Sequence, residues 1–371
     1  MFRKIFIVLM AVIFALPVSA EETIWQPEIR LGILSGVSQV ELQLSAPCAM
    51  IDATTRQILK KFPANESFTV DVDELKNNSV EIRAENVLLK DLIVTIDGKK
   101  YFGGVRIDKR NNALVVINLA PVEEYLRGVV PEEMSPSFNT EALKAQAVAA
   151  RSFTLKNRNR HQSEGYDLCP TTHCQYFGGV DSADDKTDKI ILSTRGEVLL
   201  SEGQIVDTNF HTDSGGMTES VAEVWGTDSS YLQAVEELEK NTQAWTKEFS
   251  AADFSRIVGG IGNLIEINLS PLEVGKSAPD RSTSGRVKVV QFVGSSKTLQ
   301  IKGNELRSKF SLPSTLFDIK ISGSKIIFSG YGRGHGVGMS QNGANAYANH
   351  GWTYEKILNH YYTGTKLKKL Y

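Results

Sequence analysis

The sequence predicts an α+β fold, in which mixed β-sheets and a few helices surround a cleft and a smaller β-rich region comes first. Two observations carry this prediction. Short runs that alternate apolar and polar residues, such as 40–44, recur along the chain and are typical of half-buried strands. A single long run with helical spacing and many alanines, residues 140–155, stands among them.

Residues 1–20 have the pattern of a secretory signal peptide. Arg3 and Lys4 precede an apolar run over 5–16, and small residues at 18–20 form a cleavage site. The apolar run is short for a membrane span, and an uncleaved anchor is the alternative. We expect an exported protein with no membrane span after signal cleavage.

Composition bounds the class of protein. The chain has 41 Lys and Arg against 43 Asp and Glu, a net charge of −2, which gives no general attraction to nucleic acid or to anionic lipid. Its 371 residues suggest two or three units, and we expect a β-rich accessory region over 21–100 and a larger domain over 101–371. Three cysteines, one of them Cys48, are too few for a disulfide scaffold.

The remaining elements follow from periodicity and breakers. The accessory region has strand patterns and no residues that suggest chemistry, and a hairpin leads from it into the larger domain. Later strands alternate with helices, and the last helices are bounded by capping residues and glycines. Strands are expected at 40–44, 80–82, 92–96, 105–107, 113–117, 190–192, 197–200, 206–210, 286–292 and 298–301, and helices at 251–258, 304–310, 340–349 and 353–364.

The most informative stretch precedes and includes the alanine-rich helix. A strand-like stub at 129–130 is stopped by a proline, and Glu132 and Glu133 follow at once. Asn139 or Thr140 then caps the helix. Its small side chains predict a closely packed, buried helix, so the turn before it is held rigidly. Partial burial of a carboxyl in such a turn raises its pKa and suits it to act as a general acid.

Cys169, His173 and Cys174 form a second cluster, with His161 upstream. Thiolates and imidazoles favour tetrahedral zinc, so these four residues are candidate zinc ligands. A local disulfide between the two cysteines and a pair of free thiols are the alternatives in an exported protein. A zinc hydrolase is disfavoured, because the sequence lacks H-E-x-x-H.

Two glycine-containing segments complete the candidates. In HTDSGG, residues 211–216, the His, Asp and Ser lie too close together in sequence for a Ser-His-Asp triad, and no G-x-S-x-G surrounds Ser214. In GYGRGHGVGMSQ, residues 330–341, no G-x-G-x-x-G fingerprint occurs, which excludes a dinucleotide site.

Five segments together resemble the SpoIID/LytB domain family of bacterial lytic transglycosylases and amidase enhancers. They are EEYLRGVVPEEMSPSF with EALKAQAVAARSFTL, DLCPTTHCQYFGG, FHTDSGGMTES, SGRVKVV and GYGRGHGVGMSQNGANAYANHGWTYEKILNHYYTGT, in the order of the family. The resemblance covers roughly residues 100–371. It implies a periplasmic or cell-wall location, a glycan-binding cleft and a peptidoglycan substrate.

The resemblance also implies roles for residues. Glu133 would be the catalytic acid that cleaves the MurNAc–GlcNAc bond and forms 1,6-anhydro-MurNAc ends, preferably on strands stripped of stem peptides. A hydrolase would need a second carboxylate, for which Asp213, Glu219 and Glu223 are candidates. The expected substrate contacts are Gln146, Arg151, Gln175, Tyr176, Ser214, Gly215, Gly216, His335, Ser340 and Gln341.

Two further implications concern cofactor and partner. Some members of the family bind zinc at a cluster like Cys169, His173 and Cys174, where the metal shapes the site. The alternative function is a non-catalytic glycan-binding protein that enhances an N-acetylmuramoyl-L-alanine amidase, which would then be a partner.

Overall fold

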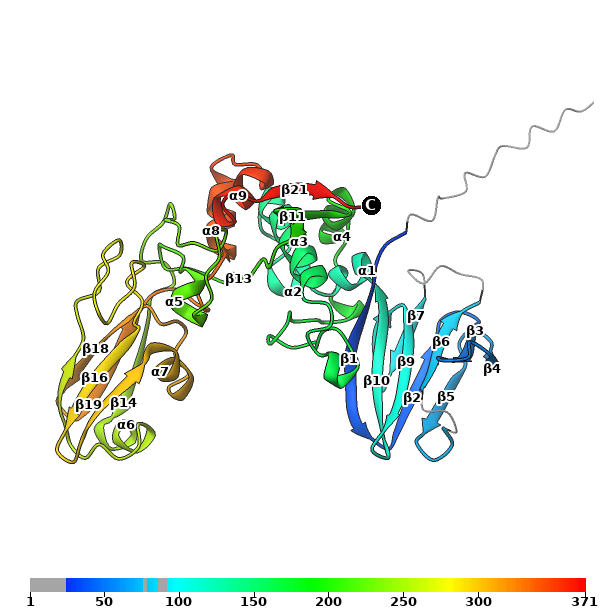
Figure 1. Cartoon of the computed structure of the whole chain (residues 1–371), viewed down its shortest axis with the longest axis horizontal. Coiled ribbons are helices and arrows are strands. Elements are labelled where there is room, and N and C mark those ends of the chain that lie inside the picture. The colour runs from blue at the N-terminus through cyan, green and yellow to red at the C-terminus, as the bar shows by residue number, and fades with distance from the viewer. Residues whose placement is uncertain (1–24, 76–78, 86–91) are drawn as a thin grey trace, which may run out of the picture.

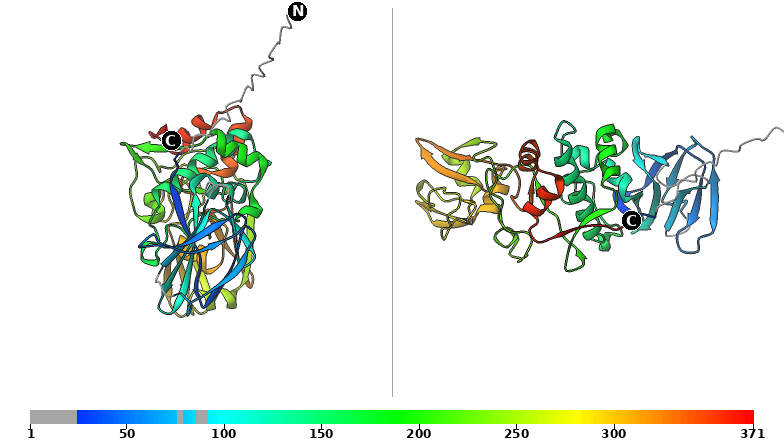
Figure 2. Two further views of the ribbon diagram at one scale, coloured as in Figure 1. Left: turned by 90° about the vertical axis from the view of Figure 1, so that its right-hand side faces the viewer. Right: turned by 90° about the horizontal axis from the view of Figure 1, so that it is seen from above.

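A computed structural model describes residues 25–371 except 76–78 and 86–91. The expected signal peptide lies outside these residues. Figure 1 shows three parts along the long axis: a β-sheet part formed by the first strands, a central helical part, and a second β-sheet part. Figure 2 shows the same order from above, with the helices between the two groups of strands. The α+β fold class is confirmed.

The first part consists of two antiparallel sheets with strand orders β1-β10-β9-β6-β3-β4 and β5-β2-β7-β8. In β2 the side chains alternate between exposed and buried, as the period-two pattern predicts. The strands are β1 (Glu28–Val37), β2 (Gln39–Leu44), β3 (Cys48–Asp52), β4 (Ile58–Phe62), β5 (Ser67–Asp71), β6 (Ser79–Ala84), β7 (Ile93–Ile96), β8 (Lys99–Phe102), β9 (Gly104–Arg110) and β10 (Ala113–Pro121).

The larger of these sheets extends beyond residue 100. Strands β9 and β10 form the expected hairpin, but β10 also pairs along its length with β1, from Glu28 opposite Pro121 onward. The boundary expected between 21–100 and 101–371 therefore divides this sheet, and it also falls inside β8 of the other sheet. The strands of this part end at Pro121, where helix α1 begins.

The central part surrounds helix α3. It contains α1 (Val122–Arg127), α2 (Val130–Glu133), α3 (Thr140–Lys156), the 3-10 turns η2 (Gln162–Glu164) and η3 (Val180–Ser182), α4 (Asp185–Ser193), α8 (Gln341–Asn349), α9 (Tyr354–Tyr361) and a sheet of β12 (Gln204–Ile205), β11 (Glu197–Ser201) and β21 (Lys366–Lys369). Two strand predictions are wrong. Residues 190–192 lie in α4, and 129–130 lie at the start of α2, because a proline in the first helical turn favours a helix.

Helix α3 is buried over most of its length. Asn139 is its N-cap, and its side chain accepts a hydrogen bond from the Glu141 N–H at 3.0 Å. Its alanines at 142, 145, 147, 149 and 150 are fully buried and leave room for α8, α9, α4 and β11 to approach. The close packing predicted from the small residues is confirmed, and it fixes the turn that precedes the helix.

The second β-sheet part has a hydrophobic core of its own, rich in phenylalanine. It comprises the sheets β14-β19-β18 and β15-β16-β17 with helices α6 and α7. Its elements are β14 (Trp245–Ser250), α6 (Ala251–Ile257), β15 (Leu264–Asn268), β16 (Val289–Gly294), β17 (Thr298–Lys302), α7 (Gly303–Lys309), β18 (Phe317–Ser322) and β19 (Lys325–Gly330). The helices expected near 251–258 and 304–310 are confirmed.

The chain passes between the central part and the second β-sheet part twice. The two passages lie side by side, because β13 (Phe210–His211) pairs in parallel with β20 (Met339–Ser340). Helix α5 (Val221–Trp225) lies beside this junction. The strand expected over 206–210 is thus reduced to its last residue and His211. Within the described residues, no helix is both long and apolar enough to cross a membrane.

Candidate active site

A cavity of about 970 Å³ lies where the central part meets the second β-sheet part. This volume is at the upper end of the range for ligand sites. Both parts contribute residues to its lining. The lining residues are Glu133, Phe153, Arg160, Thr172, His173, Cys174, Asp207, Asn209, Phe210, His211, Thr212, Trp225, Lys247, Arg307, Ser311, Leu312, Pro313, Arg333, Gly334, His335 and Gln341.

Glu133 lies at the last residue of α2 and is half-buried at the cavity wall. Its Oε1 accepts a hydrogen bond from the backbone N–H of Tyr176 at 2.9 Å. Burial raises the pKa of the Glu133 carboxyl, and hydrogen bonds from Tyr176 and Gln341 oppose that rise only in part. The carboxyl is therefore held in place and more readily protonated than an ordinary glutamate, as a general acid requires.

The neighbouring Glu132 has a different environment. Its side chain is exposed and does not line the cavity, and its carboxylate accepts a hydrogen bond from the Ser182 hydroxyl. The two adjacent glutamates therefore differ in structure. Only Glu133 combines access to the cavity with partial burial.

None of the three expected second carboxylates lines the cavity. Asp213 is buried and accepts hydrogen bonds from the Gly215 N–H at 2.8 Å and from the Thr242 hydroxyl at 2.6 Å. Glu219 is buried against two serine hydroxyls. Glu223 pairs with a lysine at the surface. Asp213 and Glu219 therefore brace loops.

Asp207 is the other carboxylate that lines the cavity, within the part of the chain that the structure describes. Its Oδ1 accepts a hydrogen bond from the Asn157 side chain at 2.9 Å, and its backbone N–H donates to the Tyr231 hydroxyl.

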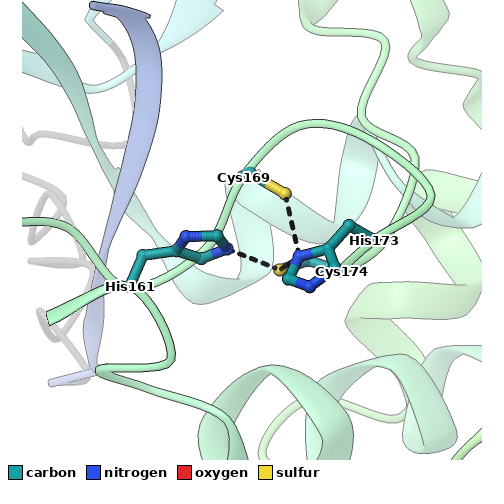
Figure 3. A group of neighbouring side chains, drawn as sticks. All are labelled: His161, Cys169, His173 and Cys174. Atoms are coloured by element: carbon teal, nitrogen blue, oxygen red, sulfur yellow. Dashed lines mark hydrogen bonds between the residues drawn. The ribbon is translucent and has the colours of Figure 1, made fainter. Parts of the chain in front are cut away.

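The Cys/His cluster borders the same cavity. Figure 3 shows His161, Cys169, His173 and Cys174 pointing toward one another. Their ligand atoms all lie within 4.8 Å of one another, and both cysteines are free thiols. His161 Nε2 is 3.4 Å from the Cys174 Sγ, and His173 Nδ1 is 3.7 Å from each Sγ.

The four side chains fit a tetrahedral zinc ion. Zn–S and Zn–N bonds of about 2.3 and 2.05 Å at a tetrahedral angle hold S and N about 3.6 Å apart, close to the separations found here. Hydrogen bonds from Thr171 and His173 outweigh the effect of burial and lower the pKa of Cys169 to about 6, whereas burial raises the pKa of Cys174 to about 11. His161 Nδ1 also lies 2.6 Å from Glu164, an outer partner that orients a ligand histidine.

The cluster is linked to Glu133 by a short loop. Cys174 is two residues before Tyr176, whose N–H holds Glu133. Between them, Gln175 is buried and accepts hydrogen bonds from the Thr154 hydroxyl at 2.8 Å and from the Tyr125 hydroxyl at 3.3 Å. Gln175, expected at the substrate, instead ties this loop to the central part. A cross-link among the four cluster residues would therefore fix a donor to the Glu133 carboxyl.

Two α3 residues that were expected to contact the substrate, Arg151 and Gln146, are instead buried. The Arg151 guanidinium is fully buried and makes a two-pronged ion pair with Glu123, at 2.9 and 2.8 Å. Gln146 is also fully buried, and its Oε1 lies 3.5 Å from Nε2 of Gln341, which does line the cavity. Neither residue lines the cavity, and Gln146 lies behind Gln341, which does.

The expected contacts in HTDSGG lie behind the cavity wall. Ser214 is buried and accepts a hydrogen bond from the Gly216 N–H at 3.0 Å. Gly215 has φ +79°, and a Cβ there would lie 2.6 Å from Leu316, so glycine is needed for the turn. Ser340 is buried as the N-cap of α8. Ser214 and Gly215 therefore shape the turn, and neither lines the cavity.

Two histidines of the glycine-containing segments do reach the cavity, with ring centroids 5.5 Å apart. His335 was expected there, whereas His211 was not. Burial and the nearby charges of Arg307 and Arg286 lower the pKa of His335 to about 4. Burial likewise lowers the pKa of His211, so both imidazoles are neutral near pH 7. The half-exposed Trp225 lies against His335, at 5.2 Å between centroids.

Sequence reasoning missed the cavity residues of the second β-sheet part, among them Lys247 and Arg307. Of the expected site residues, Glu133, His173, Cys174, His335 and Gln341 line the cavity. Tyr176 contributes its backbone N–H, while its ring is 46% exposed. The fold and this geometry define an α+β protein with one perturbed carboxyl at a cavity, beside a Cys/His cluster.

Comparisons with known proteins agree with this class. The family model described as Stage II sporulation protein (SpoIID) matches residues 110–200, and a domain of unknown function (DUF8618) matches residues 229–338. Stage II sporulation protein D of Bacillus subtilis is 34% identical over 267 residues, which cover 67% of this chain and 75% of that protein. The chain belongs to the SpoIID family.

Two other relatives are similar over a longer stretch. An uncharacterized protein of Brachyspira hyodysenteriae is 30% identical over 308 residues, 79% of each chain. The amidase enhancer of Bacillus subtilis is 31% identical over 338 residues, which cover 78% of this chain and 47% of that protein.

Proposed function

We propose that this protein is an exported peptidoglycan lytic transglycosylase that acts in cell-wall remodelling, on glycan strands stripped of stem peptides. The observation that carries the proposal is the placement of Glu133, half-buried at the cavity wall with a raised pKa. Membership of the SpoIID family and the names of the Bacillus subtilis relatives support a cell-wall role.

One carboxyl group suffices for this reaction. The protonated Glu133 donates its proton to the oxygen between MurNAc and GlcNAc as the bond from that oxygen to C1 of MurNAc breaks. The resulting carboxylate then takes the proton of the C6 hydroxyl of MurNAc, and O6 bonds to C1 to close the 1,6-anhydro ring. The N–H of Tyr176 and the side chain of Gln341 hold the carboxyl in both steps.

Zinc bound by His161, Cys169, His173 and Cys174 would have a structural role in this mechanism. The ion would cross-link the loop that ends at Tyr176 and so fix the N–H that holds Glu133. All four protein ligands are then used, which leaves no open position for a substrate.

A second function is favoured by one relative's name. The amidase enhancer of Bacillus subtilis suggests a glycan-binding protein that stimulates a cell-wall amidase without cleaving glycan. The cavity would serve this function equally well, but the raised pKa of Glu133 would have no purpose in it.

Digestion of peptide-free glycan strands, followed by mass spectrometry, separates the two functions. The wild-type protein should release fragments with 1,6-anhydro ends, and Glu133→Gln should release none while keeping its fold. Glu132→Gln is the matched control, because this neighbour does not line the cavity, and it should retain activity. Full activity of Glu133→Gln would remove Glu133 from the mechanism. Amidase stimulation without anhydro ends would establish the enhancer.

A further inference from the structure

The side of the cavity that the second β-sheet part forms carries an excess of positive charge. Lys247 of β14, Arg307 of α7 and Arg333 after β19 line the cavity, and Arg160 adds a fourth cation. The whole chain has a slight excess of acidic residues. The charge of the cavity is therefore a local feature and not a property of the whole surface, and we refer to Lys247, Arg307 and Arg333 as the cationic wall.

Arg307, in α7, is one member of this wall. Its side chain is half-buried, and burial lowers the pKa of its guanidinium. Among the residues that the structure describes, no acidic side chain lies within ion-pair distance of it. A partly desolvated cation without a counter-charge is unfavourable, and an anionic ligand would compensate this cost. A guanidinium suits a carboxylate best, because its two N–H groups match the two oxygens.

The other two members leave their charge available as well. The Lys247 Nζ donates a hydrogen bond to the backbone carbonyl of Ser311 at 2.7 Å, which holds the ammonium at the cavity rim without neutralising it. Arg333 is exposed and makes no ion pair within the described residues. Since both nearby imidazoles are neutral near pH 7, the positive charge of this side of the cavity comes from the lysine and the arginines.

We propose that the cationic wall is a subsite for the free lactyl carboxylate of a muramic acid unit beside the cleaved bond. The inference rests on the proposed function, because the glycan must lie at Glu133 for its neighbouring units to reach Lys247, Arg307 and Arg333. In a strand that carries stem peptides, the lactyl group ends in a neutral amide. Removal of the peptide exposes a carboxylate at that position, so this wall recognises the stripped strand by its charge.

Binding measurements on the full chain test the subsite without turnover. In a Glu133→Gln background, three probes are compared: peptide-free glycan oligomers, the same oligomers with their carboxylates converted to primary amides, and oligomers that carry stem peptides. We expect amide conversion to weaken binding about tenfold or more, because it removes the charge without adding bulk. Adding Lys247→Met or Arg307→Met should weaken binding of the free-acid oligomers by a similar factor and leave that of the amide form unchanged.

Matched controls lie on the same β-sheet part, outside the cavity. Lys320→Met and Arg256→Met remove exposed cations of the same types. They should change neither the affinity for the free-acid oligomers nor the affinity for the amide form. Arg307→Lys keeps the charge and should retain most of the preference for the free acid.

Three results decide the proposal. Equal binding of the acid and amide forms would overturn it. Equally tight, Arg307-dependent binding of peptide-bearing oligomers would also overturn it, because the recognised carboxylate would then belong to the peptide. A clear preference for the free acid in a protein whose Glu133-containing form releases no anhydro ends would support the subsite and overturn only the transglycosylase activity.

Discussion

Replacement of Arg151 should destabilise the central part of the protein rather than act on the substrate. Arg151→Met removes a fully buried guanidinium and leaves Glu123, which is only 6% exposed, without its cation. Breaking a buried ion pair from one side costs about 3–5 kcal/mol. Glu123 keeps two donors, the Tyr371 hydroxyl at 2.7 Å and the Gly196 N–H at 3.2 Å, so we expect the lower end, about 3 kcal/mol.

Hydrogen exchange of the α3 amides is the suitable assay, because the chain has more than one hydrophobic core and need not unfold in one step. A loss of 3 kcal/mol corresponds to roughly 150-fold faster exchange of the slowest α3 amides. The double variant Glu123→Gln with Arg151→Met removes both charges and should recover much of the protection.

Two outcomes would refute this reasoning. Exchange in Arg151→Met within threefold of wild type, roughly 0.6 kcal/mol, would mean that the ion pair contributes little. Unchanged hydrogen exchange together with loss of glycan cleavage would mean that Arg151 acts on the substrate, as the family resemblance implied.

Three other outcomes are expected. The pKa of Glu133 is raised in the folded state, so the wild-type protein loses stability as the pH rises through that pKa. Glu133→Gln should therefore be more stable than wild type at about pH 7 and equally stable at about pH 3.5. Urea unfolding of both proteins at the two pH values checks this. A chelator should remove one zinc ion per chain, as metal analysis would measure, and should speed hydrogen exchange of the Tyr176 amide and lower glycan cleavage. Absence of bound metal after purification without chelator would contradict the zinc site. Asp207→Asn should retain anhydro-product formation, whereas its complete loss would indicate a second catalytic carboxylate.

Sequence patterns predicted the structural features that depend on residues close together in the sequence. The strand at 40–44 and the cap at Asn139 follow from local periodicity and local hydrogen bonding, and both are found. The boundary expected at residue 100 falls within a sheet, because the pairing that builds the sheet joins distant residues: Glu28 lies opposite Pro121, and no local signal records that contact.

The site residues also differ in whether nearby sequence predicts them. Glu133 and the Cys/His cluster could be recognised from the sequence because each lies in a short motif. Arg151 was expected at the substrate, whereas the structure buries it beside Glu123, 28 positions away, a pairing that no local pattern indicates. Arg307 could not be found at all, since it reaches the cavity only through the packing of a separate hydrophobic core.

The manner in which the second β-sheet part is attached has a consequence for protein engineering. Its first strand begins at Trp245, its last strand ends at Gly330, and these two residues lie directly opposite each other in antiparallel register. A unit whose two ends meet is suited to excision, because a short turn can replace it without stretching the remainder. Such a shortened protein would keep Glu133 and its loop, and grafting the equivalent unit from a relative would exchange one side of the cavity as a module.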